Sequence, residues 1–172
     1  MAGLAGTIQA KKSAASEAVE LLFLGFAAGE QAYALGIFAV GEILKIPKIY
    51  SLPKVPAFLK GVIDLRGAIV PVLDFRERLG QGAVDLKTGR VVVALLGGKT
   101  AGLLVDSVEE VFRATPSDIK QTPDVYKKPG LEFIQGMTRV GDHLYLLIDP
   151  SILLTPEEVA SLSRQGGWSP AK

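Results

Sequence analysis

Short apolar runs that alternate with polar residues dominate the chain from Val19 onward, and turns containing glycine or proline separate them. Alternation with a period of two is typical of β-strands that bury one face. The pattern predicts five strands in each half of the chain, followed by a short helical turn at Phe75–Leu79 and at Ser151–Leu154. The first-half strands are predicted at Val19–Ala27, Ala32–Ile37, Glu42–Ile49, Lys60–Leu65 and Ala68–Leu73. The second-half strands are predicted at Arg90–Leu96, Thr100–Val105, Val108–Ala114, Glu132–Val140 and His143–Ile148.

The segment Leu21–Gly41 is long and apolar enough to be read as a membrane-spanning helix. Several glycines interrupt it, and the polar stretch Gly29–Gln31 at its middle predicts a turn instead. We therefore expect two successive strands and no membrane insertion. The lysines Lys11–Lys12 are not followed by the apolar core of a signal peptide, so none is expected.

The two halves of the chain resemble each other. A shift of 68 residues places Phe23–Ile46 on Val91–Ala114, and a shift of 75 places Phe58–Leu79 on Phe133–Leu154. Few residues are identical, but turn glycines, apolar alternation and a closing aspartate stay in register. The alternative, that any two β-rich halves look alike, stays open. The repeat predicts that each half curls into a small five-stranded barrel and that the two barrels bury apolar faces against each other.

The repeat sets the expected domain boundaries. A core domain is predicted over residues 18–160, with halves at about 19–80 and 88–155. Residues 1–17 lack periodicity and predict a disordered arm, and residues 161–172 are expected to form a C-terminal tail. Thr155 and the residues after it have the pattern of a helix start, which predicts a short helix that ends at about Arg164.

The composition argues against an active site. The chain has 19 Lys+Arg and 18 Asp+Glu, a net charge of +1, no cysteine and one histidine, His143. A lone histidine has no partner to share a metal or a proton, and Gly97–Thr100 lacks the first glycine of a phosphate-binding loop. Asp74 and Asp149 each end a strand before a helical turn, which favours N-capping over catalysis. We expect no catalytic residues, no metal site and no cofactor.

A local basic cluster consists of Lys45, Lys48, Lys54 and Lys60. Few aromatic residues lie among these lysines, so the cluster is more typical of a solvated face than of a nucleic-acid groove. An acidic patch on a protein partner is the other interpretation.

The most specific stretch of the chain is Val55–Phe75, VPAFLKGVIDLRGAIVPVLDF. Its two apolar runs are separated by Arg66-Gly67, which predicts a tight hairpin turn. The stretch resembles the signature of the CheW family of chemotaxis coupling proteins, although Asp64 stands where the family usually has Asn and Phe75 where Leu is common. The matching residues are Pro56, Phe58, Lys60, Gly61, Val62, Leu65, Arg66, Gly67, Ile69, Pro71, Val72, Asp74 and Arg76.

The resemblance implies a mainly β fold of two pseudo-repeated five-stranded SH3-like barrels that share a core, with short helices and a C-terminal helix. It also implies a non-enzymatic adaptor that couples the cytoplasmic tips of chemoreceptors to the regulatory domain of the histidine kinase CheA. Such an adaptor is expected in the cytoplasm, associated with membrane receptor arrays. Three alternatives remain: a coupling protein of another chemosensory-like pathway such as gliding or pilus motility, a small β-barrel enzyme or nucleotide binder, and a nucleic-acid-binding double barrel.

The resemblance also implies a receptor-binding surface. Its positions correspond to Val40, Glu42, Gly61 and Arg66, and Val91 matches a further position near it. Glu42 and Arg66 are charges within largely apolar segments, where an unpaired charge would cost several kcal/mol. They either form a salt bridge, or Arg66 presents its guanidinium to a partner while Glu42 fixes the rotamer. The two roles are compatible.

Overall fold

The predicted strands all form, with bounds that differ from the expected ones by a few residues. The structure is a computed structural model that describes residues 11–12 and 19–164. The strands are β1 (Lys11–Lys12), β2 (Val19–Ala28), β3 (Gln31–Gly36), β4 (Val40–Lys45), β5 (Leu59–Leu65), β6 (Ala68–Asp74), β7 (Arg90–Leu96), β8 (Lys99–Val105), β9 (Ser107–Ala114), β10 (Ile134–Val140) and β11 (His143–Ile148). The helices are η1 (Ile37–Ala39), α2 (Phe75–Arg78), η2 (Pro116–Asp118), η3 (Asp124–Tyr126), η4 (Pro150–Ile152) and α3 (Pro156–Arg164), of which those marked η are 3-10 helices.

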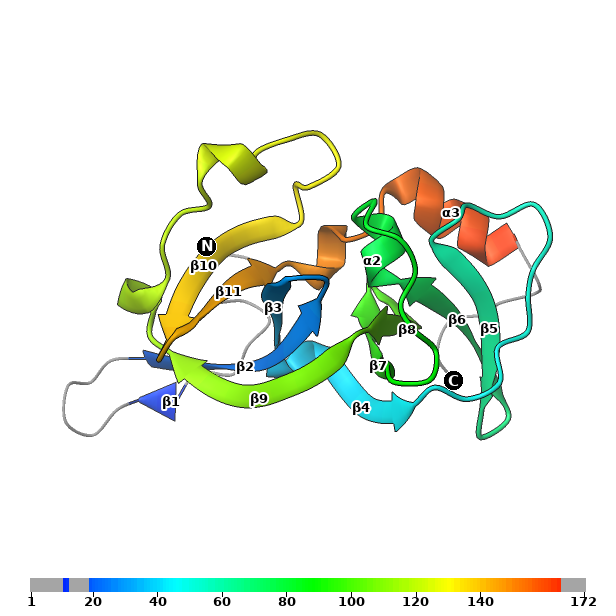
Figure 1. The fold of residues 1–172 in the computed structure, drawn as a ribbon, viewed down its shortest axis with the longest axis horizontal. Coiled ribbons are helices and arrows are strands. Elements are labelled where there is room, and N and C mark those ends of the chain that lie inside the picture. The colour runs from blue at the N-terminus through cyan, green and yellow to red at the C-terminus, as the bar shows by residue number, and fades with distance from the viewer. Residues whose placement is uncertain (1–10, 13–18, 165–172) are drawn as a thin grey trace.

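Two five-stranded units lie side by side (Figure 1). Unit I contains β2, β3, β9, β10 and β11, and unit II contains β4, β5, β6, β7 and β8. In unit II, backbone hydrogen bonds between Tyr50 and Val62 join the segment after β4 to the far edge strand β5. In unit I the equivalent bridge joins Lys120 to Met137 of β10. Each sheet therefore curls back on itself, which confirms the expected pair of barrels.

The barrels do not coincide with the two sequence halves, and this corrects the expectation of one barrel per half. The β2–β3 hairpin of the first half joins β9, β10 and β11 of the second half, and β7–β8 joins β4, β5 and β6. The pairings obey the repeat: β2 lies antiparallel to β9 as β7 does to β4, and β3 lies parallel to β11 as β8 does to β6. The repeat predicts the order of the elements along the chain. Because equivalent strands of the two halves carry the same alternation, the pattern alone does not specify whether a hairpin pairs with strands of its own half or of the other half.

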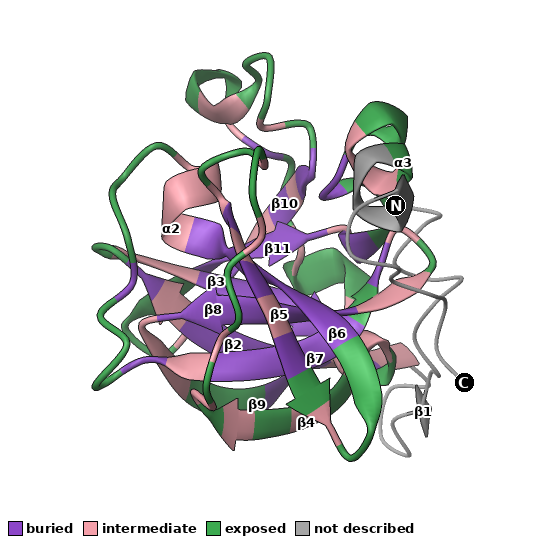
Figure 2. Ribbon diagram, turned by 90° about the vertical axis from the view of Figure 1, so that its right-hand side faces the viewer, coloured by how far each residue is buried: buried purple, intermediate pink, exposed green. Residues whose placement is uncertain are grey.

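The core has three parts that follow this arrangement. One large cluster takes residues from both units, including Phe26 and Tyr33 of unit I and Leu103 of unit II. Each unit adds a smaller cluster of its own, around Phe23 in unit I and around Val91 in unit II. Figure 2 shows the buried positions concentrated on the strands and the exposed ones on the connecting loops. The large cluster confirms that the two barrels share a core.

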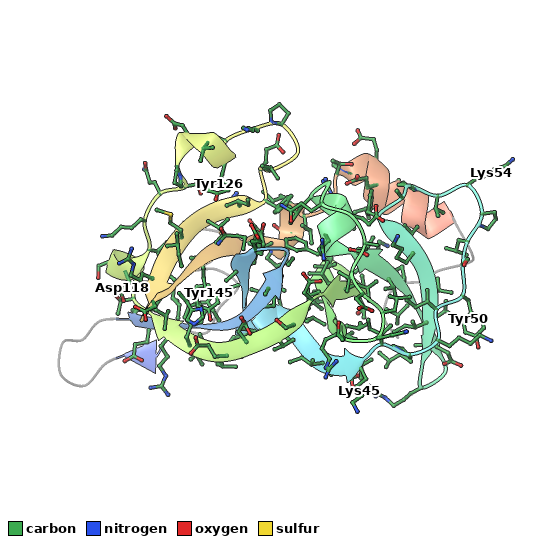
Figure 3. The ribbon with its side chains drawn as sticks, in the orientation of Figure 1. Lys45, Tyr50, Lys54, Asp118, Tyr126 and Tyr145 are labelled. Atoms are coloured by element: carbon green, nitrogen blue, oxygen red, sulfur yellow. The ribbon has the colours of Figure 1, made fainter. Side chains whose placement is uncertain are left out.

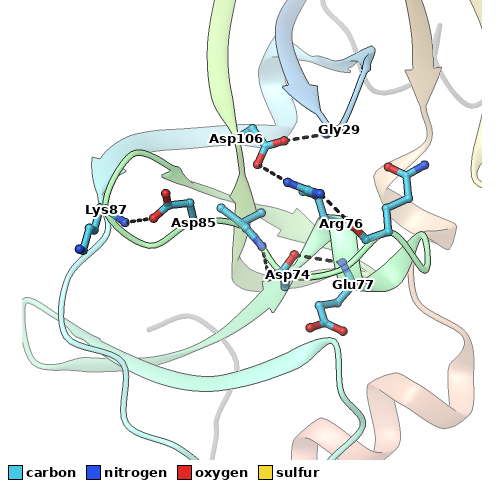
Figure 4. Close-up of polar contacts among 9 residues, drawn as sticks. Gly29, Asp74, Arg76, Glu77, Asp85, Lys87 and Asp106 are labelled. Carbon is cyan, nitrogen blue, oxygen red and sulfur yellow. Dashed lines mark hydrogen bonds and ion pairs between the residues drawn. The ribbon is translucent and has the colours of Figure 1, made fainter.

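Two buried or partly buried aspartates organise the region around α2, and one of them joins the two units (Figure 4). Asp74 is fully buried and accepts hydrogen bonds from the backbone N–H groups of Glu77 and Val84, at 3.1 and 2.9 Å. Asp106 accepts the backbone N–H of Gly29 at 2.6 Å and lies 3.5 Å from the guanidinium of Arg76. Gly29 is in the β2–β3 turn of unit I and Arg76 is in α2 of unit II, so this network connects the units.

Both predicted N-caps are confirmed, since Asp149 accepts the backbone N–H of Ser151 at 2.9 Å as Asp74 accepts that of Glu77. The C-terminal helix α3 is also confirmed. Its capping box links the Thr155 hydroxyl to the Glu158 N–H at 3.1 Å and the Glu158 carboxylate to the Thr155 N–H at 2.8 Å.

Pro71 lies within β6, and a proline within a strand is typical of an edge strand or a bulge because it cannot donate to the ladder. Its strand β6 is not at an edge, since it lies between β8 and β5, but the β5–β6 ladder does shift register beside it, between Leu59 and Gly61 opposite Leu73 and Val72. The ladder to β8 begins one residue later, at Val72. The missing N–H of the proline therefore falls outside that ladder, which explains why an inner strand tolerates it.

The chain ends are described only in part. Lys11 and Lys12, within the expected arm, pair with Glu20 and Val19 at the start of β2. The rest of the expected arm, and the expected tail from residue 165, lie outside the described residues. Among the described residues, no helix is both long and apolar enough to cross a membrane.

Candidate partner-binding surface

The hairpin between β5 and β6 turns at Arg66 and Gly67, as the sequence predicts. Both residues have positive φ, 52° and 90°, as a type I′ turn requires at its two central positions. The Asp64 carboxylate accepts the backbone N–H of Gly67 at 2.8 Å, which stabilises the turn. Of the two charges beside the turn, Asp64 is therefore structural, and Arg66 is directed outward at the tip.

Arg66 and Glu42 form a salt bridge that joins the hairpin tip to β4. Both terminal guanidinium nitrogens of Arg66 donate to Glu42, Nη1 to Oε2 at 3.3 Å and Nη2 to Oε1. The hydrogen bond from Arg66 lowers the pKa of Glu42 below its usual value, and the carboxylate raises the pKa of Arg66. The Arg66 side chain is nevertheless 72% exposed, against 33% for Glu42. This bidentate contact thus restricts the Arg66 side chain, which remains exposed and accessible to a partner.

Gly61 is buried on β5, the strand that leads to the Arg66 turn. Its φ of +144° is a conformation that L side chains rarely adopt, and an added Cβ would overlap the carbonyl group of Tyr50. Because Tyr50 forms the bridge to Val62 that closes unit II, Gly61 is needed for that closure.

The remaining two predicted residues differ in exposure. Val40 begins β4 and is partly exposed, packed against the core cluster that the two units share. A bulge separates Val40 from Glu42, since they pair with the consecutive residues Ala94 and Val93 of β7. Val91 is fully buried in the core cluster of unit II, where it pairs with Leu44 of β4. The structure thus brings Glu42 and Arg66 together at the surface of unit II, leaves Val40 partly exposed beside the shared core, and buries Gly61 and Val91.

Sequence reasoning missed a set of exposed apolar residues that the repeat relates in pairs. Ile43 of β4 and Val111 of β9 are 43% and 55% exposed, and they are 68 residues apart. Ile69 of β6 and Leu144 of β11 are 45% and 41% exposed, and they are 75 residues apart. The alternation predicts which face each residue occupies, and the two shifts could have identified the pairs. Each unit therefore displays an equivalent apolar pair.

Other candidate sites take structural roles. Gly97 and Gly98 form the β7–β8 turn with φ of 60° and 80°, so they are a hairpin and not a phosphate-binding loop. His143 is exposed at the start of β11, with its ring 6.0 Å from that of Tyr145. In the part of the chain that the structure describes, no group of three His, Cys, Asp or Glu residues could hold a metal ion.

Comparison with known proteins identifies the family of this chain. The model of the CheW-like domain matches residues 22–158, which is most of the sequence. The chain belongs to the CheW family. Its members are non-enzymatic scaffolds of chemotaxis signalling, and the solved relative TtCheW from Thermoanaerobacter tengcongensis is described as a scaffolding protein. That structure is 31% identical, covers 80% of this chain and 94% of its own, and superimposes with a TM-score of 0.71.

Curated CheW relatives span nearly the same length. The chemotaxis protein CheW of Klebsiella aerogenes is 34% identical over 161 residues, covering 93% of this chain and 95% of the relative. The CheW of Rhizobium meliloti is 32% identical over 136 residues, covering 78% and 88%. The protein FrzA of Myxococcus xanthus is 31% identical over 111 residues, covering 64% and 69%.

Proposed function

We propose that this chain is a coupling protein that joins the cytoplasmic tips of chemoreceptors to the regulatory domain of the histidine kinase CheA. It would act in the cytoplasm, within arrays of membrane receptors. Membership of the CheW family supports this role. The observation that carries the proposal is Arg66: an exposed guanidinium at a hairpin tip, fixed in orientation by Glu42.

The receptor would bind at the surface formed by Val40, Glu42 and Arg66. Because the salt bridge already restricts the Arg66 side chain, little rotamer entropy is lost when a partner carboxylate or carbonyl meets its remaining donors. Gly61 and Val91 would act indirectly, by maintaining the closure and the core of unit II.

CheA would bind at the opposite ends of the two barrels. Ile43 and Ile69 are exposed on unit II, and their repeat equivalents Val111 and Leu144 are exposed on unit I, so each unit offers apolar residues at equivalent positions. Two similar but non-identical ends suit head-to-tail contacts with a kinase domain of the same fold, and such contacts form rings or extended arrays. Each contact can then be weak, of micromolar strength or about 8 kcal/mol, because an array engages many at once.

The binding module would span residues 18–160, the predicted core domain, and the family match at 22–158 lies within these bounds. A second candidate function is coupling in a different chemosensory-like pathway, such as gliding or pilus motility. The similarity to FrzA of Myxococcus xanthus favours considering it. The choice between the two depends on which receptor and kinase fragments bind.

A titration with two fragments tests the proposal. The chain is titrated with a receptor-tip fragment and, in parallel, with a CheA regulatory domain, each at two salt concentrations. We expect saturable micromolar binding to both, and we expect Arg66→Glu to weaken receptor binding more than tenfold. Arg139→Glu is a matched control, since Arg139 is an exposed arginine beside the equivalent hairpin of unit I. Absence of binding to either fragment would overturn the proposal, as would equal effects of the two variants on receptor affinity.

A further inference from the structure

The connection between β9 and β10 is longer than its counterpart in unit II, and it encloses a hollow. It spans residues 115–133, six more than residues 46–58 between β4 and β5, and it contains the helix η3. The hollow has a volume of about 560 Å³, which lies in the range of roughly 300–1,000 Å³ that is typical of ligand pockets. Ordered long connections in compact domains commonly carry a binding function. The additional residues of unit I are therefore candidates for a site that unit II does not share.

Hydrogen bonds hold this connection against β10, so the walls of the hollow have defined positions. Backbone groups of Lys120 and Met137 exchange two hydrogen bonds, at 2.8 and 3.0 Å. The buried Thr122 hydroxyl donates to the carbonyl oxygen of Ile134 at 3.2 Å. All residues that line the hollow belong to the connection or to β10, and Figure 3 places Tyr126 of η3 on unit I. The hollow is therefore separate from the salt bridge at Arg66, which belongs to unit II.

The inner wall of the hollow is apolar and continues the shared core. Ile134 is a buried member of the core cluster that both units form, and Tyr126 and Leu131 pack against that cluster. Tyr126 also lies close to Tyr33 of β3, since burial and this neighbour together raise the pKa of Tyr33 to about 12. An apolar side chain that enters the hollow would thus extend an existing hydrophobic core, and its removal from water would favour binding.

The rim of the hollow is polar, and its positive charges are more available than its negative one. Lys128 is exposed, and no acidic side chain among the described residues forms an ion pair with it. Lys127 pairs with Asp124 at 3.5 Å, but the Asp124 side chain is 97% exposed, so this pair is weak. The Glu132 carboxylate already accepts the backbone N–H of Gly130 at 2.8 Å. The rim therefore complements a carboxylate better than a cation.

We propose that this hollow is a binding site for an acidic peptide segment of a protein partner, which inserts one large apolar side chain between η3 and β10. The apolar side chain covers Tyr126, Leu131 and Ile134, and the flanking carboxylates meet Lys127 and Lys128. A buried apolar anchor supplies most of the affinity of such a contact, and complementary charges at its rim supply specificity. The site lies on unit I and does not rest on the proposed function.

Three short peptides, blocked at both ends, test this chemistry against the full isotope-labelled chain. The first has two glutamates on each side of a central phenylalanine, the second replaces the phenylalanine by alanine, and the third replaces the glutamates by lysines. Binding is followed by NMR through the backbone amide resonances. We expect the first peptide to cause saturable shifts at residues 121–135 and to bind at least about fivefold more tightly than the other two. The proposal fails if these shifts are absent or centred elsewhere, or if the alanine or lysine peptide binds equally well.

Two variants with matched controls separate the charge from the apolar wall. Lys128→Glu should weaken binding of the first peptide about fivefold, whereas Lys87→Glu, at an exposed lysine of unit II, should change it less than about twofold. Leu131→Ala should weaken binding about threefold, and its control Leu86→Ala, at an exposed leucine of unit II, should leave it unchanged. Thermal unfolding verifies that each variant folds. Equal affinities for Lys128→Glu and Lys87→Glu would overturn the proposal even if Leu131→Ala proves unstable.

Discussion

Phe75 offers the sharpest test of the shared core, because it extends from unit II into a cage of unit I residues. Its ring is fully buried and makes edge-on contacts with Phe26, Tyr33 and Phe133, at centroid separations of 5.4, 4.9 and 6.0 Å. The first two lie on β2 and β3, and the third lies just before β10. Removal of this ring therefore removes contacts between the units as well as apolar burial.

The expected cost follows from these contacts. Phe75→Ala should lower the free energy of unfolding by about 3–5 kcal/mol, the range for a fully buried phenylalanine. Phe75→Leu, which introduces the residue common in the family signature, retains most of the volume and loses the edge-on pairs, each worth about 0.5–1.5 kcal/mol. Some of that loss is recovered by repacking, so we expect about 1–3 kcal/mol. The Leu variant should thus lie between the wild type and the Ala variant.

Urea unfolding followed by far-ultraviolet circular dichroism measures these differences in the free energy of unfolding, and thermal unfolding gives the change in melting temperature. The Ala variant should lower the melting temperature by roughly 10 °C, since each kcal/mol shifts a chain of this size by about 2–4 °C. Leu86→Ala is the control: Leu86 is 55% exposed, and we expect a change within about 0.5 kcal/mol. A Phe75→Ala effect no larger than that of Leu86→Ala would refute the argument. Two separate transitions in the wild type would contradict the shared core itself.

Three further predictions follow from single contacts. Gly61→Ala should cost about 1–3 kcal/mol, because the backbone is strained at positive φ and the new Cβ overlaps the carbonyl group of Tyr50. Gly67→Ala is also at positive φ but in open space, so it should cost less. Chemical denaturation gives the free energy of unfolding of both variants, and the difference between them reflects the overlap. Asp74→Ala should cost roughly 2–4 kcal/mol, because it removes an N-cap and leaves the buried Val84 N–H unpaired, and a loss below 1 kcal/mol by the same assay would contradict that role. Because the folded pKa of Glu42 lies below its unfolded value, the salt bridge contributes fully above the unfolded pKa and is lost as the pH falls through the folded one. An NMR titration should show the Glu42 pKa rising toward its usual value in Arg66→Gln, and no rise would exclude Arg66 as the cause.

Local features were predictable from the sequence because each depends on neighbouring residues. The Arg66-Gly67 turn follows from the type I′ preference for a final glycine, and the N-caps at Asp74 and Asp149 follow from an aspartate placed between a strand and a helical turn. The strand partners were not predictable in the same way. Since β4 and β9 are equivalent in the repeat, alternation gives β2 no preference between them. Burial of Gly61 and Val91 also depends on these long-range pairings, so the motif alone could not separate contact residues from supporting ones.

The repeat gives the two units the same arrangement of strands, but equivalent positions in the two units carry side chains with different partners. Glu42 of unit II and Glu110 of unit I occupy equivalent positions, yet their partners differ. The Glu110 carboxylate accepts the hydroxyl of Tyr145 at 2.8 Å, and burial together with this hydrogen bond raises the pKa of Tyr145. Glu110 is thus bound to a core side chain, whereas Glu42 holds an exposed arginine. At the position equivalent to Arg66, unit I has Gly141 in its hairpin turn. In the part of the chain that the structure describes, unit II therefore has an oriented guanidinium at its hairpin turn where unit I has a glycine. An adaptor that must distinguish two partners requires such a difference between otherwise similar ends.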